Sequence, residues 1–285
     1  MDKLTNISNM IGAARADIIR GKRENRLTAD IVRKFAGIHM VDDFGAPIIA
    51  AAHHAFWLQL FCDERIKKLL IIAPPETAKT TWVLAFVGCY IGFYPENSVI
   101  ISSVAGAVAE KRSLSLRAMC ESAAWQATFT GATLLTAATG FKYTTEEWSL
   151  APNGRPRAGR LHPTVFSVGR GGSVIGGRAD LVIADDLLDM DSTRTEAQRK
   201  LGEQWIHSSL ISRAKSKTGR VIMIGNGWHP EDFYSQMLRD SKGFVVVRMA
   251  TMNNDGDNGY FADITYPDDW QYETLGQRVG VAEVK

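Results

Sequence analysis

Six runs of apolar, often β-branched residues recur along the chain, each bounded by turn residues. They show little strict alternation of apolar and polar positions, which is typical of strands buried on both faces. Stretches with helical periodicity at 80–93, 105–121 and 193–211 lie between several of them. This order predicts an α/β fold with a central, mainly parallel sheet flanked by helices. The expected strands are 66–73, 98–104, 164–169, 180–185, 219–226 and 244–249.

Local signals mark the ends of these segments. Thr193 and Glu196 fit a capping box that opens the third helix, and Pro95 ends the first helix within a few residues. Between 140 and 163, short aromatic and polar pieces with Gly and Pro predict a hairpin or loop beside the sheet.

Composition divides the chain into three parts. Residues 1–60 are expected to form a helical lead-in, residues 61–255 the core, and residues 256–285, rich in Asn, Asp, Gly and Tyr, a linker or lid. The uncharged apolar stretch 80–95 is shorter than the roughly 20 apolar residues that span a bilayer. With no basic-then-apolar leader in sight, the chain is expected to have no membrane segment.

The composition is that of a globular enzyme. At 285 residues and 45% hydrophobic content, the chain can bury a large core without disulfides. The widely spaced Cys62, Cys89 and Cys120 form no zinc or disulfide pattern, which predicts a reducing, cytosolic setting.

The net charge of +2 is too small to indicate nucleic-acid binding, so any DNA contact must depend on local basic patches. For each patch the alternative is an ordinary solvated surface. The patches are Arg15, Arg20, Lys22, Arg23, Arg26, Arg33 and Lys34; Arg155, Arg157 and Arg160; and Arg213, Lys215, Lys217 and Arg220.

A phosphate-binding loop is predicted where the strand LLIIA runs into APPETAKTT and then into an apolar helix. In such a loop Lys79 reaches the β- and γ-phosphates of ATP, and the Thr80 hydroxyl holds Mg²⁺. Alanines at 73 and 78 replace both glycines of the usual pattern, although alanine disfavours positive φ. The alternative is an ordinary loop that contains Ala-Lys-Thr. The expected nucleotide-binding residues are Pro75, Glu76, Thr77, Ala78, Lys79, Thr80 and Thr81.

The strand LVIAD ends in a pair of carboxylates, about a hundred residues after the loop. Asp185 is predicted to hold Mg²⁺ through a bound water, and Asp186 to polarise the attacking water. Taken alone, two adjacent aspartates at a strand end also fit a helix-capping turn. The loop and the acidic strand in this order favour an ATPase site.

A third segment, VIMIGNGWHPEDF, places Asn226 at the end of the next strand. An amide there can contact the γ-phosphate or the attacking water; the alternative is a simple Asn-Gly turn. His229 lacks a second ligand at metal spacing and is interpreted as structural. Pro230, Glu231 and Asp232 suit the first turn of a helix.

The set of motifs resembles the ATPase domain of the large terminase subunit of tailed bacteriophages. The segments that carry the resemblance are HHAFWLQLF, IIAPPETAKTT, VIISSVAGAVAEKR, GGRADLVIADDLLD and IGNGWHPEDF.

The resemblance implies an ASCE-type P-loop ATPase that uses ATP and Mg²⁺ to pump double-stranded DNA into a preformed shell, in the cytoplasm of the infected bacterial host. It implies a homo-oligomeric ring, usually of five subunits, docked on a portal protein, with the small terminase subunit as a partner. Family members also carry a C-terminal nuclease domain. Residues 256–285 look like the run-up to it, and no nuclease activity is predicted for these residues.

Some relatives place an arginine inside the phosphate loop, where this chain has Glu76 and Thr77. A charge-stabilising arginine must then come from elsewhere, such as a neighbouring subunit. Arg178 is the first candidate, Arg170 the second and Arg112 the third; the alternative for each is a plain surface arginine.

Two other functions stay open. One is a different DNA-dependent P-loop ATPase, such as a helicase-like enzyme, which needs a second RecA-like half that this length scarcely allows. The other is a nucleotide-binding scaffold with weak turnover, suggested by Ala78.

Overall fold

A computed structural model describes residues 3–155, 162–174, 177–252 and 258–267. Arg157 and Arg160 of the second basic patch, and most of the expected C-terminal linker, lie outside these ranges.

A nine-stranded sheet with the order β3-β4-β5-β2-β6-β7-β1-β8-β9 forms the centre of the described chain. The six strands from β5 to β8 in this order are all parallel, and β3, β4 and β9 add antiparallel edges. The expected mainly parallel sheet is therefore confirmed, and each of the six predicted strands is present. The strands are β1 Lys68–Ile72, β2 Val99–Ser103, β3 Ala132–Leu135, β4 Glu147–Pro152, β5 Val165–Gly169, β6 Leu181–Asp185, β7 Arg220–Gly225, β8 Val245–Met252 and β9 Asn258–Thr265.

The strand order decides which loops meet. One strand, β7, lies between β1, which leads into the expected phosphate loop, and β6, which ends in the carboxylates. Because β1, β6 and β7 are parallel, their carboxyl ends meet at one edge of the sheet.

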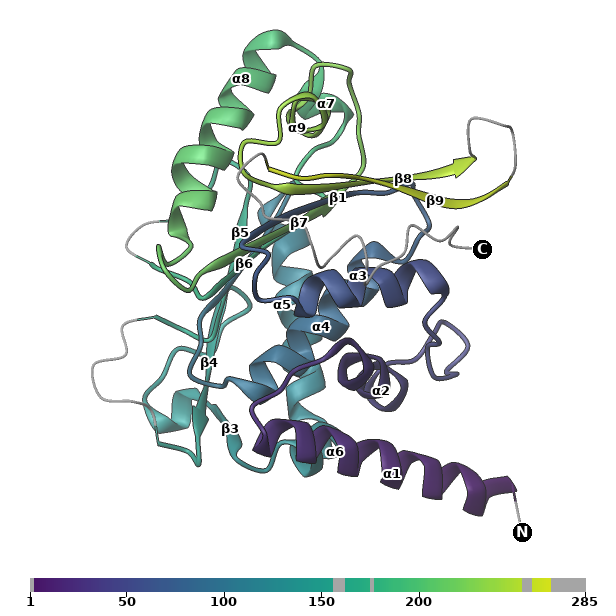
Figure 1. The fold of residues 1–285 in the computed structure, drawn as a ribbon. Helices are drawn as coiled ribbons and strands as arrows, with labels where there is room; N and C mark the ends of the chain where they lie inside the picture. Colours follow the sequence, from purple (N-terminus) through teal and green to yellow (C-terminus); the bar gives the residue numbers. More distant parts are fainter. Residues whose placement is uncertain (1–2, 156–161, 175–176, 253–257, 268–285) are drawn as a thin grey trace.

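Helices cover both faces of the sheet (Figure 1). Successive strand residues point to opposite faces, so Leu69 and Ile71 belong to one hydrophobic core while Leu70 and Ile72 belong to the other. The first core contains side chains from α1 to α6, and the second contains side chains that follow α8 and side chains of α9. The helices are α1 Lys3–Arg23, α2 Ala29–His39, α3 Ala52–Cys62, α4 Lys79–Phe93, α5 Gly106–Glu121, α6 Ala123–Thr128, α7 Met190–Thr193, α8 Glu196–Trp205 and α9 Phe233–Arg239.

The third predicted helix is divided in the structure. Asp189 caps the short α7, which ends at Thr193, and α8 begins only at Glu196. Its capping box is formed by Thr195 and Gln198, two residues beyond the expected pair. Thr193 and Thr195 are each followed three residues later by a Glu or Gln, as a capping box requires. The Thr193 hydroxyl, however, donates to the Asp189 carbonyl at 2.9 Å. The helical path continues after α8 as a π-helix over Ile206–Leu210 and a 3-10 turn over Ile211–Arg213.

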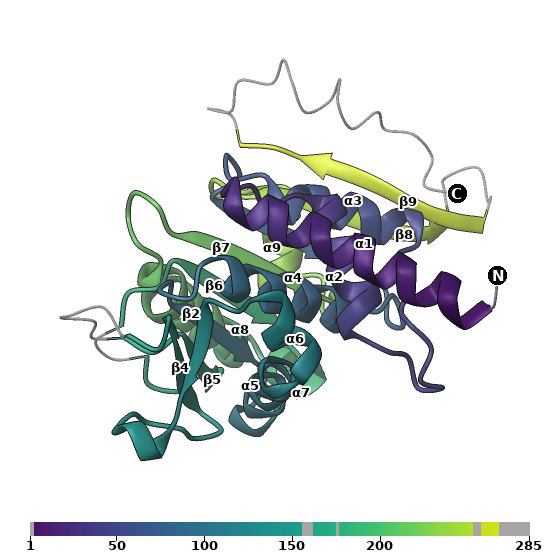
Figure 2. The ribbon, with the colours of Figure 1, turned by 90° about the horizontal axis from the view of Figure 1, so that it is seen from below.

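The N-terminal helices are part of the main core. Ile18 of α1, Phe35 of α2 and Trp57 of α3 are fully buried in the same cluster as strand residues. Seen from below, α1 crosses the outside of this layer, and β9 and β4 lie toward opposite sides of the molecule (Figure 2). The part of the C-terminal segment that is described forms β9, which pairs antiparallel with β8. The expected boundary at 255 lies outside the described residues.

Arg220 was predicted in a basic surface patch, and this prediction is wrong. Its side chain is buried, and its guanidinium donates to the carbonyl oxygens of Phe61 at 2.7 Å, Ile66 at 2.9 Å and Leu60 at 3.3 Å. Two of these carbonyls belong to the last turn of α3, where backbone acceptors have no partner within the helix. Arg220 therefore joins α3 to the start of β7.

Three further expectations from the sequence concern the cysteines, the first basic patch and membrane-spanning segments. Cys89 and Cys120 are buried, and burial raises the pKa of both thiols. Lys22 donates to the Gly92 carbonyl at 2.6 Å, which takes it out of the free basic surface. In the described part of the chain, no helix has the length and apolar character needed to cross a bilayer.

Candidate nucleotide site

The segment between β1 and α4 is held in an unusual backbone shape. Glu76 has φ of 62° and Ala78 has φ of 54°, so two residues with side chains occupy the left-handed region that favours glycine. Ala78 is the N-cap of α4. Inside the turn, the Thr77 hydroxyl donates to the Pro74 carbonyl at 2.8 Å. The loop thus has a compact, glycine-like backbone without glycine, and it ends at the N-terminus of a helix, which attracts anions.

Lys79 is folded back onto this loop. Its ammonium group donates to the carbonyl oxygens of Pro74 at 2.8 Å and Ala73 at 3.2 Å. Burial lowers the pKa of Lys79, while the carboxylates of Asp186 and Asp185 act in the opposite direction. The loop therefore holds a cation at its centre.

Thr80, Asp185 and Arg112 form a connected cluster beside the loop. The Thr80 hydroxyl donates to the two carboxylate oxygens of Asp185, at 2.8 and 3.0 Å. Arg112, on α5, donates from Nε to the same carboxylate at 2.9 Å and approaches the Thr80 hydroxyl at 3.5 Å. Asp185 is only 1% exposed, so its charge is compensated inside the protein.

Asp186 has a strained and fixed backbone. Its φ is 50°, its N–H donates to the Ile224 carbonyl at 2.9 Å, and its carbonyl accepts from Val104 N–H at 3.0 Å. Burial, followed by the neighbouring Asp185 carboxylate, raises the pKa of Asp186 against the lowering effects of Lys79 and Arg112. A carboxylate with a raised pKa in a cleft suits proton transfer.

A cleft of about 500 Å³ brings these segments together. It collects the expected loop residues, Asp186 and Asn226, while Asp185 is buried beneath it. Two polar or aromatic lining residues, Asp189 and the 47% exposed Trp228, were not identified from the sequence. The lining residues are Pro75, Glu76, Thr77, Ala78, Lys79, Thr80, Thr81, Val104, Asp186, Leu188, Asp189, Asn226 and Trp228.

The segment after β7 is shaped by Asp232. This fully buried carboxylate accepts from the N–H groups of Trp228 at 2.7 Å and His229 at 3.0 Å, and it caps α9 through Ser235 N–H. Asp232 is thus the N-cap of α9 and lies just before its first turn. His229 accepts from Glu231 N–H at 3.0 Å, in keeping with a structural role.

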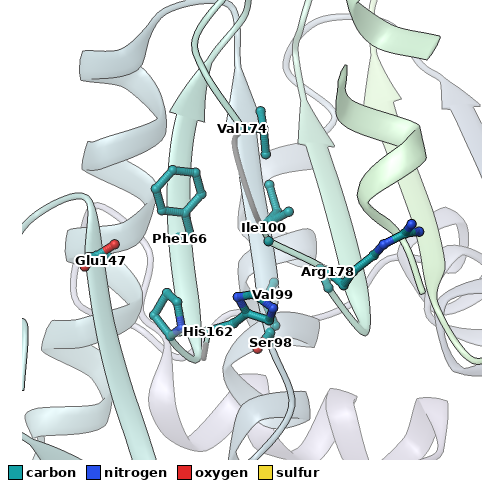
Figure 3. Close-up of a pocket in the computed structure, with 11 residues that line it drawn as sticks. Ser98, Val99, Ile100, Glu147, His162, Phe166, Val174 and Arg178 are labelled. Carbon is teal, nitrogen blue, oxygen red and sulfur yellow. The ribbon is translucent and has the colours of Figure 1, made fainter. Parts of the chain in front are cut away.

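Arg178 does not reach the cleft of its own chain. It precedes β6, whereas Asp185 ends that strand, so about 17 Å of strand separates the two ends. Arg178 donates to the Ser212 carbonyl at 3.3 Å. It lines a second pocket, with Ser98, His162 and Phe166, at the amino ends of the strands (Figure 3). Any role in ATP hydrolysis would therefore have to be in a neighbouring subunit.

The other two candidate arginines lie at the carboxyl end of the sheet. Arg170 follows β5 and approaches α8 closely enough that a Cβ on Gly202 would meet its guanidinium at 2.7 Å. It does not line the cleft described above. Arg112, ranked last from the sequence, is the one that contacts Asp185.

The donor set at the Thr80–Asp185 pair fits Mg²⁺. A hydroxyl and a carboxylate converge within 3.0 Å beside a loop suited to phosphate, and Mg²⁺ is usually held by one or two protein oxygens together with substrate phosphates and waters. The described residues contain no group of three or more His, Cys, Asp and Glu side chains that could hold a metal without a substrate.

No protein-family model and no curated protein matches the sequence. Among solved structures, the chain is similar to the large terminase of bacteriophage HK97, with a TM-score of 0.49 and 13% identity over 81% of this chain and 46% of that one. This chain therefore spans about half the length of that terminase.

It is also similar to the ATPase domain of the large terminase of Thermus phage P74-26, with a TM-score of 0.45 and 14% identity over 68% of this chain and 70% of that one. A mutant of the same domain gives a TM-score of 0.44. These proteins are of the class that the sequence motifs resemble. The likeness concerns the fold, and the chemistry of the cleft is inferred from its own residues.

Proposed function

We propose that this chain binds ATP with Mg²⁺ in the cleft at the carboxyl ends of β1, β6 and β7 and hydrolyses it. The observation that carries the proposal is the meeting of three features from distant segments. These are a lysine at the start of a helix, the Thr80–Asp185 pair and a half-buried Asp186 with a raised pKa.

Each residue has a separate role in this proposal. The loop residues 75–81 cradle the phosphates, and Lys79 exchanges its two carbonyl acceptors for phosphate oxygens. Thr80 and Asp185 would hold Mg²⁺, which when bound would neutralise charge on the phosphates. Asp186 orients the attacking water and accepts its proton. Asn226 lines the same cleft, and in this proposal its amide contacts the γ-phosphate or the attacking water.

The wider role that the sequence motifs favour is a motor that packages viral double-stranded DNA, as in large terminase subunits. The proposed setting is a homo-oligomeric ring on a portal protein in the cytoplasm of an infected bacterium, with the small terminase subunit as partner. In this proposal residues 1–60 form a helical lead-in that packs on the ATPase core of 61–255, and 256–285 lead toward a nuclease domain.

Phosphate release from ATP in the presence of Mg²⁺ tests the proposal. We expect Lys79→Ala to abolish nucleotide binding, because the loop loses its cation. Asp186→Asn is expected to keep binding while turnover falls by about two to four orders of magnitude, since the proton acceptor is lost. Equal loss of binding in both variants would contradict the division of roles.

A nucleotide-binding scaffold with weak turnover is the second candidate, and the left-handed Ala78 favours it. Tight binding of ATP without measurable hydrolysis by the unmodified chain, under conditions that allow assembly, would support this candidate over the motor.

A further inference from the structure

His54, on α3, is hydrogen-bonded to the phosphate loop from outside the cleft. Its Nε2 lies 3.0 Å from the carbonyl oxygen of Thr77, and its Nδ1 lies 3.1 Å from the backbone nitrogen of Ala51. A backbone N–H can only donate and a carbonyl can only accept, so Nδ1 must be bare and Nε2 must carry the proton. One neutral tautomer satisfies both contacts, and the ring has no remaining polar atom.

The ring is also fixed by packing. His54 is 8% exposed and stacks on Trp82 of α4, with centroids 4.9 Å apart and an interplanar angle of 27°. Trp57 packs against it edge-on at 5.5 Å, and the ring of His53 lies 3.8 Å away. Trp82 belongs to the first turn of the helix that follows the loop. His54 therefore touches both the loop and the helix that the loop starts.

The Thr77 carbonyl that His54 contacts lies between two residues with positive φ. Thr77 is flanked by the left-handed residues Glu76 and Ala78, where a side chain disfavours the backbone conformation. Where this loop pattern has glycine, the backbone can turn without strain. In this chain the turn must be held by contacts around it.

We propose that His54 is a positioning residue of the phosphate loop, which holds the Thr77 peptide in the orientation that the left-handed Ala78 requires. His54 thereby takes over part of the role of the missing glycine. The inference rests on the proposed function, since it describes the same nucleotide site.

Equilibrium binding of a fluorescent ATP analogue with Mg²⁺, together with kcat and KM for hydrolysis, tests the proposal. His54→Phe keeps an aromatic ring against Trp82 but removes the donor. We expect its affinity to fall about threefold to tenfold, the usual effect of one hydrogen bond. KM should rise with kcat nearly unchanged, because a misplaced loop weakens substrate and transition state alike. His54→Gln, which retains an N–H near the Nε2 position, should recover most of the affinity.

The decisive measurement is a double-mutant cycle with Ala78→Gly. If His54 compensates for the side chain at position 78, His54→Phe should lose most of its effect on affinity in the glycine background. Equal effects in the two backgrounds would overturn the proposal. His207→Phe serves as a control, because His207 packs edge-on against Phe233, which belongs to the other core. A comparable loss of affinity there would show a general effect of losing a histidine.

The tautomer can be checked independently of nucleotide. Nitrogen-15 shifts of the imidazole at neutral pH should show a protonated Nε2 and a bare Nδ1; the opposite tautomer would remove the basis of the inference. Failure of the proposed function looks different, because the unmodified chain would then not bind the nucleotide at all.

Discussion

The Thr80 hydroxyl and the Asp185 carboxylate are hydrogen-bonded although 105 positions separate them in the chain. The contact joins the first turn of α4 to the last residue of β6. It brings the two halves of the expected nucleotide site within one hydrogen bond of each other, and Arg112 completes the cluster from α5.

Replacing Arg112 with Met should lower the Mg²⁺ concentration needed for half-maximal ATP binding, because a positive charge next to Asp185 is removed. The same change should destabilise the free protein by about 3 kcal/mol, since it leaves a buried carboxylate less compensated. Titration of Mg²⁺ at fixed nucleotide, and denaturant unfolding without nucleotide, measure the two effects. Arg117→Met, on the same helix but stacked on Tyr143, is the matched control. Unchanged Mg²⁺ dependence in Arg112→Met would contradict this view of the cluster.

Changing Ala78 to Gly should stabilise the chain by up to about 1 kcal/mol. The left-handed conformation costs a residue with a side chain roughly 1–2 kcal/mol, and the greater freedom of glycine in the unfolded state offsets part of the gain. Ala73→Gly is the control, because Ala73 is buried and has no positive φ. There the glycine should only destabilise. Thermal or urea unfolding of the two variants should therefore shift in opposite directions, and shifts of the same sign would argue against strain at Ala78.

Stability should fall as the pH drops from about 6.5 to about 4. Burial lowers the pKa of both His39 and His54 to about 4, so the folded chain resists protonation in this window while the unfolded chain takes up protons. More protons bound in the unfolded state means that the free energy of unfolding rises with pH. Urea unfolding at pH 7 and pH 5 measures the effect. His39→Phe should make the slope shallower, and an unaltered slope would remove His39 as a cause.

If Arg178 acts in a neighbouring subunit, Arg178→Ala protein mixed with Lys79→Ala protein should regain part of the ATPase activity. Each variant alone should be inactive, but a mixed interface can pair an intact nucleotide cleft with an intact arginine. Phosphate release under assembling conditions is the measurement. Arg170→Ala in the same mixture provides the comparison, and absence of any recovery with Arg178→Ala would exclude the trans role.

The central strands and the strand–loop–helix order around Lys79 could be predicted because their signals are local. A buried parallel strand is a short apolar run, and Lys79-Thr80 follows one such run directly. The antiparallel edge strand β3 and the pairing of β9 were missed, since their pattern is weaker and depends on the neighbouring strand.

The partners of the arginines could not be predicted from the local sequence, because they lie far away in the chain. Arg220 looks like a member of a basic cluster, yet its partners are carbonyl groups about 155 positions earlier, and only the fold brings them near. The first candidate, Arg178, comes just before the acidic strand in the sequence, but it lies at the end of that strand opposite Asp185. Arg112, the third candidate, is the one whose side chain contacts Asp185.

Helix α3 is attached at both ends, to the phosphate loop through His54 and to the start of β7 through Arg220. The far end of β7 leads to Asn226 in the same cleft. The loop, α3 and β7 are therefore connected in series through the body of the domain, and both the loop and the end of β7 lie at the cleft. A displacement of the loop during a nucleotide cycle would be passed through His54 and α3 to the start of β7, because hydrogen bonds hold α3 at both ends.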